Sequence, residues 1–175
     1  MENEMTEPSK SQPTPPELET FLAGLHKVHS RDDQHVTEPH IVVHSTDAYW
    51  LTAEQTGNPS HIGLLRHLPM KTVEVLLQLI PANSATDLQR HVHESVHFVI
   101  EGTGWSEIGD RVVRWDKGDF VFTPPWIWHR HYADASDVQM LLIENSRILN
   151  ELDADQRETL GNIGFTEAFG AKDPA

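Results

Sequence analysis

The 175-residue sequence contains no cysteine. Disulfide bonds and thiolate ligands are therefore excluded, and any bound metal must be held by nitrogen and oxygen donors. Basic residues are scarce, because 13 Lys and Arg stand against 27 Asp and Glu, which gives a formal net charge of -14. Nucleic acids and anionic membrane surfaces bind basic protein faces, so we expect neither as a partner.

Long apolar runs are also missing. No segment approaches the roughly eighteen apolar residues that span a bilayer, and the N-terminus is acidic and polar rather than basic and then apolar. We therefore expect a soluble, cytoplasmic protein that binds a small molecule. The length is that of a single domain with one core, and no internal repeat divides the chain.

The N-terminal residues 1–16 contain four prolines and no apolar periodicity, which is typical of a disordered tail. The single domain is expected over residues 17–175. Thr14 and Glu17 have capping-box spacing. Apolar residues follow them at helical spacing, namely Leu18, Phe21, Leu22, Leu25 and Val28. This pattern predicts a short amphipathic helix near the N-terminus.

Three further segments have the composition of strands. The run HIVVH at residues 40–44, the dense apolar run at 71–80 and the run at 138–143 are each predicted to be extended. Near the C-terminus, Asp153 and Gln156 have capping-box spacing and precede a leucine and a glycine. This predicts a short C-terminal helix.

The richest stretch covers residues 89–132 and holds five of the twelve histidines and four of the five tryptophans. Its histidines recur at even spacings, so on extended strands they point to one face of a sheet. They are His91, His93, His97, His129 and His131. Neutral imidazole is the commonest metal ligand in proteins, and three such groups suit iron, zinc, copper, nickel or manganese.

Turn signals separate the short β-rich runs inside this stretch. They read EGTG at 101–104, EIGD at 107–110 and DKGD at 116–119. Such signals indicate successive antiparallel strands rather than helices. The two groups of histidines could therefore meet inside one barrel.

The same stretch resembles the cupin superfamily. Residues 118–131, GDFVFTPPWIWHRH, resemble the second cupin motif, with His129 at its metal-binding position, and the segment ending FVIEGTG resembles the first motif. Together with RHVHESVHFVIEG, the stretch is similar to the ring-cleaving dioxygenases of the gentisate and salicylate type. The resemblance implies an all-β jelly-roll barrel, or double-stranded β-helix, and pairing into a homodimer or higher homo-oligomer. The capping patterns add a short helix at each end.

The resemblance also implies ferrous iron held by three histidines. Counting back from Gly102, the two ligands of the first motif fall on Gln89 and His91, so one histidine is replaced by glutamine. If the connection between the two strands is two residues shorter, the pair is His91 and His93. Both registers keep His91 and His129, and we favour His93 as the third ligand because imidazole binds late first-row ions better than an amide does.

The remaining two histidines of the stretch are interpreted as residues of the substrate pocket, with catalytic roles. In the family pattern the position of His97 carries an arginine that binds a substrate carboxylate, and the position of His131 carries a histidine that touches substrate. The loss of arginine at position 97 weakens the case for a carboxylated substrate. The histidines outside the stretch are interpreted as ordinary hydrogen-bonded groups.

The resulting hypothesis is an Fe(II) dioxygenase that uses O2 to open a hydroxylated aromatic ring or to cleave a C–C bond beside a hydroxyl or carbonyl group. A lyase or isomerase using Zn, Mn, Ni or Cu is an alternative, since a fold does not fix a function. A non-catalytic binding or accessory cupin is a third possibility, which Gln89 keeps open.

Overall fold

The computed structural model describes residues 41–170. The tail expected over residues 1–16 and the helix expected after Glu17 lie outside the described residues. The elements within them are η1 (Ser45–Asp47), β1 (Tyr49–Leu51), α2 (Ala53–Thr56), β2 (His61–Leu64), β3 (Glu74–Ile80), β4 (Leu88–His91), β5 (Ser95–Glu101), β6 (Gly104–Ile108), β7 (Arg111–Trp115), β8 (Phe120–Thr123), β9 (His129–Ala133), β10 (Val138–Glu144), α3 (Ser146–Glu151), β11 (Arg157–Gly161) and α4 (Phe165–Phe169).

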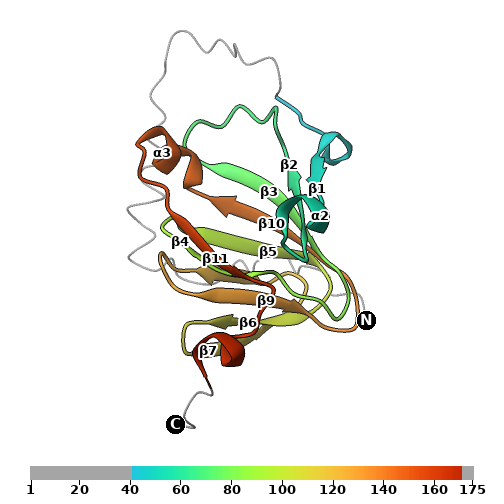
Figure 1. Ribbon diagram of the computed structural model, residues 1–175. Helices are drawn as coiled ribbons and strands as arrows, with labels where there is room; N and C mark the ends of the chain where they lie inside the picture. Colours follow the sequence, from blue (N-terminus) through green and yellow to red (C-terminus); the bar gives the residue numbers. More distant parts are fainter. Residues whose placement is uncertain (1–40, 171–175) are drawn as a thin grey trace, which may run out of the picture. The chain divides into compact units, whose positions relative to one another are not determined.

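The strands form two antiparallel sheets (Figure 1). One sheet has the order β1-β2-β3-β10-β5-β8, and the other has the order β11-β4-β9-β6-β7. The helical segments in the described part are short, so the expected all-β fold class is confirmed. None of the helices between residues 41 and 170 is long and apolar enough to cross a membrane.

The apolar core lies between the two sheets. Along β3 and β10 buried and more accessible residues alternate, and Leu76, Ile80, Met140 and Leu142 point inward. Trp115 from β7 completes the same cluster from the other sheet. Each such buried side chain contributes about 1.5–3 kcal/mol, so this cluster fixes the relative position of the sheets that carry the histidines.

The turn signals of the sequence form the expected connections. Gly109 and Asp110 join β6 to β7, and Gly109 has a φ of 58°. Gly118, in the turn between β7 and β8, has a φ of 94°. Residues other than glycine rarely adopt these positive φ values, which explains why glycine occurs in both turns.

The predicted strand at residues 40–44 is wrong over its described part. Residues 41–44 form no strand, and Ile41 and Val42 are 70% and 68% exposed. The edge of the first sheet is taken instead by β1, where the ring of Trp50 lies against Gly63 of β2. The apolar run at 71–80 does form a strand, which begins at Glu74.

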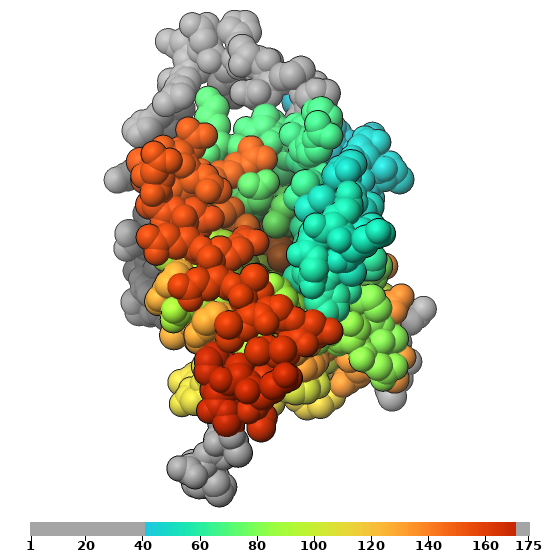
Figure 2. Space-filling view, in the orientation of Figure 1, coloured from blue at the N-terminus to red at the C-terminus, as the bar shows by residue number. Residues whose placement is uncertain are grey.

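The helix predicted after Asp153 is also wrong, because residues 157–161 form strand β11. This strand pairs with β4, and the hydroxyl group of Thr159 donates a hydrogen bond to the Asp87 carboxylate (2.6 Å). Backbone pairing with the free edge of β4 outweighs the local capping pattern. The C-terminal helix is α4, further along the chain, and in Figure 2 the orange-to-red C-terminal segment runs down the face shown.

Candidate metal centre

The five histidines of the central stretch are all buried, with side chains at most 3% exposed. His91 ends β4, His97 lies in β5, and His129 and His131 lie in β9. His93 lies in the connection between β4 and β5. Adjacent strands β4 and β9 place Gln89 directly opposite His129, so these two side chains share a face of the sheet with His91.

The rings of His91 and His129 lie edge to face, and each is held by a backbone carbonyl. Their ring centroids lie 4.7 Å apart at an interplanar angle of 72°. The Nδ1 of His91 donates to the backbone carbonyl of His93 (2.9 Å), and the Nδ1 of His129 donates to that of Ile127 (2.9 Å). A carbonyl oxygen only accepts, so each ring carries its proton on Nδ1 and leaves a lone pair on Nε2.

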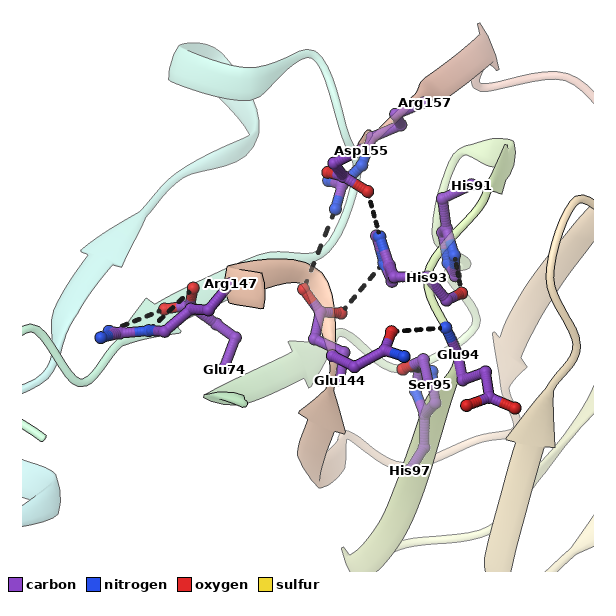
Figure 3. Close-up of polar contacts among 11 residues, drawn as sticks. Glu74, His91, His93, Glu94, Ser95, His97, Glu144, Arg147, Asp155 and Arg157 are labelled. Atoms are coloured by element: carbon purple, nitrogen blue, oxygen red, sulfur yellow. Dashed lines mark hydrogen bonds and ion pairs between the residues drawn. The ribbon is translucent and has the colours of Figure 1, made fainter. Parts of the chain in front are cut away.

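His93 is engaged on both sides by carboxylates (Figure 3). Its Nδ1 hydrogen-bonds to Asp155 Oδ1 at 2.9 Å, and its Nε2 lies 3.3 Å from Glu144 Oε2, an ion-pair contact without hydrogen-bond alignment. Burial lowers the pKa of His93, but the carboxylates of Glu144 and Asp155 raise it to a net value above the ordinary one. Arg157 lies 4.0 Å from the second oxygen of Glu144 and extends this network.

The rings of His91 and His93 are stacked, with centroids 3.6 Å apart and planes 6° apart. A metal ion lies in the plane of each imidazole that binds it, and two stacked parallel planes have no common point near both rings. In this arrangement the two rings cannot bind one ion together. The structure therefore gives no support to the preferred ligand His93, and its role as a ligand stays a prediction.

His97 and His131 face each other across the interior, with ring centroids 4.5 Å apart. The Nε2 of His97 contacts Ser95 Oγ at 3.1 Å, and the Nδ1 of His131 contacts Ser106 Oγ at 2.7 Å. The other nitrogen of each ring is buried without a protein partner, as is Nε2 of His129. Buried polar atoms are rarely left unpaired, so these three nitrogens mark a place where a ligand or water binds.

Four of the five buried histidines, all except His93, have pKa values lowered below the ordinary value. Burial, followed by the charge of His93, lowers the pKa of His91 to about 4. Burial and the neighbouring His129 lower the pKa of His97 to about 3. Burial also lowers the pKa values of His129 and His131 well below the ordinary value. Neutral imidazole is the form that binds metal, and it offers one donor and one acceptor nitrogen.

The donor set fits a metal in part. Among residues 41–170, no three His, Asp or Glu side chains converge in a geometry that could hold an ion. The unpaired Nε2 of His129 and the lone pair of His91 do suit a divalent metal. The third donor on the same face is the amide oxygen of Gln89, a neutral oxygen ligand.

The tryptophans lie around this site rather than in it. Arg90 lies over the rings of Trp126 (4.4 Å) and Trp128 (4.8 Å), and Trp105 stacks on Tyr132 at 3.8 Å. Trp115 is buried in the core. These contacts hold the outer side of the second sheet.

Residues 76–144 match the family described as Cupin domain. The match runs from β3 to the end of β10, so it contains all five histidines together with Gln89. This segment is therefore similar to a cupin domain.

A part of this chain that extends beyond residues 76–144 is similar in sequence to dioxygenases. It is 30% identical over 83 residues to 5-aminosalicylate 1,2-dioxygenase of Comamonas sp, which is 47% of this chain and 22% of that protein. It is 36% identical over 96 residues to gentisate 1,2 dioxygenase 1 of Aquipseudomonas alcaligenes, covering 54% of this chain and 25% of that protein. The matched part thus spans about a quarter of the length of these relatives.

Solved structures agree on the fold. Salicylate 1,2-dioxygenase from Pseudaminobacter salicylatoxidans superposes with a TM-score of 0.52 at 20% identity, over 66% of this chain and 30% of that one. A cupin-2 domain protein from Rhodospirillum rubrum gives 0.50 at 22% identity, over 57% of this chain and 69% of that one. At these identities the likeness shows the fold, a cupin jelly roll.

Three residues of the cupin site were missed from the sequence. Glu144 ends β10, one residue beyond the strand predicted at 138–143, Ser106 lies in β6, and Asp155 lies in the segment predicted to begin the C-terminal helix. The even spacing of Ser106 from Gly104 could have placed it on the inner face. No local signal marks Asp155 or Glu144 as partners of His93, because 62 and 51 residues separate them from it in the chain.

Proposed function

We propose that this chain is an Fe(II)-dependent cupin dioxygenase that opens a hydroxylated aromatic ring, or cleaves a C–C bond beside a hydroxyl or carbonyl group. The observation that carries the proposal is the pair His91 and His129, whose Nδ1 protons are held by backbone carbonyls and whose Nε2 lone pairs remain for a metal. The names of the sequence relatives, gentisate and 5-aminosalicylate dioxygenases, support the choice of reaction.

The proposed ligands are His91 and His129, with Gln89 at the third position. The shared face of Gln89 and His129 supports this choice, and so does the engagement of His93 by two carboxylates. When bound, a ferrous ion supplies polarisation of a substrate oxygen and the electrons that activate O2. His93 would restrain the His91 ring by stacking on it, and His93 itself is held by Asp155 and Glu144.

The chain's own contribution is orientation and proton handling. His97 and His131 lie on the two inner faces of the barrel, and each leaves one buried nitrogen without a protein partner. Since their pKa values are lowered by burial, both rings are neutral and can donate or accept one hydrogen bond from a bound substrate. The apolar core beside them limits the access of water.

The substrate class follows from the same side chains. His97 is a neutral group where a carboxylate-binding cation would stand in the resembling family, so the proposed substrate is a hydroxylated aromatic compound without a carboxylate beside that position. A homodimer or larger homo-oligomer and a cytoplasmic location belong to the same proposal.

A non-catalytic binding cupin is the second candidate. The amide of Gln89 favours it, because two imidazoles and one amide hold a metal less tightly than three imidazoles do. A lyase or isomerase on another metal would be distinguished by the identity of the ion, since a dioxygenase needs a redox-active one.

The deciding experiment is oxygen uptake by anaerobically purified protein reconstituted with Fe(II). Phenols, catechols and hydroquinones are tested beside their carboxylated analogues. We expect uptake that requires iron and is lost in His129→Ala, while His61→Ala, a control on β2 whose register partner is Leu79, keeps it. Iron binding without uptake on any hydroxylated ring would favour the binding cupin.

A further inference from the structure

A chain of buried hydrogen bonds runs behind His131. Ser106 of β6 lies directly opposite His131 of β9, and its Oγ is 2.7 Å from His131 Nδ1. The indole Nε1 of Trp115 donates to the same Oγ at 2.8 Å. Ser106 and His131 are fully buried and Trp115 is 3% exposed, so water does not compete for these bonds.

The direction of the bonds follows from the donor inventory. An indole N–H can only donate, so Ser106 Oγ accepts from Trp115. The hydroxyl proton of Ser106 then needs an acceptor, and His131 Nδ1 is the one partner of that hydroxyl besides Trp115 among the hydrogen bonds of residues 41–170. If Nδ1 carried a proton instead, the buried hydroxyl proton would have no acceptor, which is costly.

We propose that Trp115 and Ser106 fix His131 as the tautomer protonated on Nε2. His131 is thereby a hydrogen-bond donor into the barrel interior and not a metal ligand, and Ser106 is its positioning residue. The unpaired Nε2 of His131 is the atom that donates. We take the acceptor to be a negatively charged oxygen of the substrate. This identity rests on the proposed function, whereas the tautomer does not.

The neighbouring histidines have the opposite tautomer. His91 and His129 donate from Nδ1 to backbone carbonyls, so their Nε2 atoms are acceptors. The interior therefore contains two lone pairs suited to a metal and one N–H suited to an anionic oxygen. The group bound to Nδ1 of each ring decides whether its Nε2 has a lone pair or a proton. A backbone carbonyl leaves a lone pair on Nε2, and the Ser106 hydroxyl leaves a proton there.

The position of Trp115 is set by Gly104. A Cβ atom at Gly104 would collide with the indole ring of Trp115 and with the backbone oxygen of Tyr132. Gly104 is also the register partner of Trp115 across β6 and β7. The absent side chain lets the indole lie over β6 with its N–H aimed at Ser106, so the tautomer of His131 depends on a glycine two residues before Ser106.

The tautomer is measured directly by NMR of full-length protein labelled with 15N-histidine, after chelation and again with diamagnetic Zn2+. The His131 signals are assigned by their loss in His131→Gln. We expect His131 to be protonated on Nε2 in both forms, in excess over the other tautomer by about tenfold or more. A wild-type His131 protonated on Nδ1 would overturn the proposal, whatever the variants do.

Variants test the chain of bonds. Trp115→Phe removes the indole donor and Ser106→Ala removes the hydroxyl, so both should lower the excess of the Nε2 tautomer severalfold, while Ser106→Thr keeps it. Trp105→Phe is the control, because Trp105 is the neighbour of Ser106 but stacks on Tyr132. An unchanged tautomer in both Trp115→Phe and Ser106→Ala would also overturn the proposal.

The outcome is independent of the reaction. Protein without oxygenase activity would defeat the proposed function and leave the tautomer measurement standing. A His131 protonated on Nδ1 in an active enzyme would defeat the inference and leave the proposed function standing.

Discussion

We propose that His93 belongs to the site without binding the metal itself. It is fully buried and lies between the carboxylates of Glu144, 7% exposed, and Asp155, 15% exposed, which raise its pKa. Because its ring stacks on that of His91, it also restrains the orientation of the His91 ring, which is a proposed metal ligand. Removing one partner of a buried charged group leaves the others unpaired. Substitution of His93 should therefore change the free energy of unfolding as well as the metal content.

We predict that His93→Ala lowers the free energy of unfolding by about 3 kcal/mol, because Glu144 and Asp155 lose their shared partner. Its metal affinity should fall less than that of Gln89→Ala. Urea denaturation and metal titration measure the two effects. Arg114→Ala, which breaks an exposed ion pair with Asp134, is the control and should cost less than about 1 kcal/mol. Full metal loading of Gln89→Ala beside an empty His93→Ala would restore His93 as the third ligand.

Burial of neutral histidines predicts acid sensitivity of the metal-free protein. The pKa of His91 is lowered to about 4, so below pH 6.5 the unfolded chain binds more protons than the folded one. Stability from this residue is complete above pH 6.5 and is lost as the pH falls toward 4, by about 2 kcal/mol at pH 5. His97, His129 and His131 act in the same direction, because their pKa values are also lowered by burial.

His93 has the opposite sign, since its raised pKa gives stability below pH 6.5 that is lost as the pH rises through the folded value. The lowered pKa of Glu144, caused by His93 against the effect of burial, gives stability above pH 4.5 that is lost on acidification. We expect the melting temperature of chelated protein to fall between pH 7 and pH 5, and to fall less in His97→Gln. A melting temperature that stays constant over this interval would contradict the burial of neutral rings.

At the scale of elements, β11 and the residues just before it bring Arg157 and Asp155 to the site. The strand pairs with β4 along the edge opposite β9, and Thr159 donates to an Asp87 oxygen while Asn58 donates to the other (2.6 Å). The C-terminal segment is therefore fastened beside the strand that carries Gln89 and His91. Loosening it should disturb the site as well as the fold.

We predict that Thr159→Ala costs about 1.5–3 kcal/mol, the range for a hydrogen bond to a charged group. Thr159→Ser keeps the hydroxyl and should restore most of the loss. Chemical denaturation gives the stabilities, and hydrogen exchange of β4 amides reports the local opening. Equal stability of the alanine and serine variants would show that the Asp87 contact does not hold β11.

The elements that the sequence predicted are those with a local signal. The hairpin from β6 to β7 is marked by Gly109, and the strands β3 and β10 by dense apolar residues. The strand β11 has a local helix-capping pattern and becomes a strand because β4 offers an edge. The partners of His93 likewise come from segments more than fifty residues away, so neither could be found from local spacing.

At the scale of the whole molecule, the cupin barrel brings together one motif from β4 and β5 and another from β9. The family match and the shared fold place the five histidines in one cupin-like domain. The family resemblance singled out His91 and His129 as the proposed metal ligands. The spacing of the histidines alone indicated only that some metal binds. The ring orientations and hydrogen bonds differ among five histidines that look equivalent in the sequence, and the proposed roles rest on these differences.

The central claim is that His91 and His129 hold a metal, and elemental analysis of anaerobically purified variants tests it most directly. We predict that wild type and His61→Ala carry one transition-metal ion per chain, while His91→Ala and His129→Ala lose it, with affinity lower by more than about a hundredfold. Circular dichroism confirms that each variant is folded. Normal metal content in a folded His129→Ala would contradict the account.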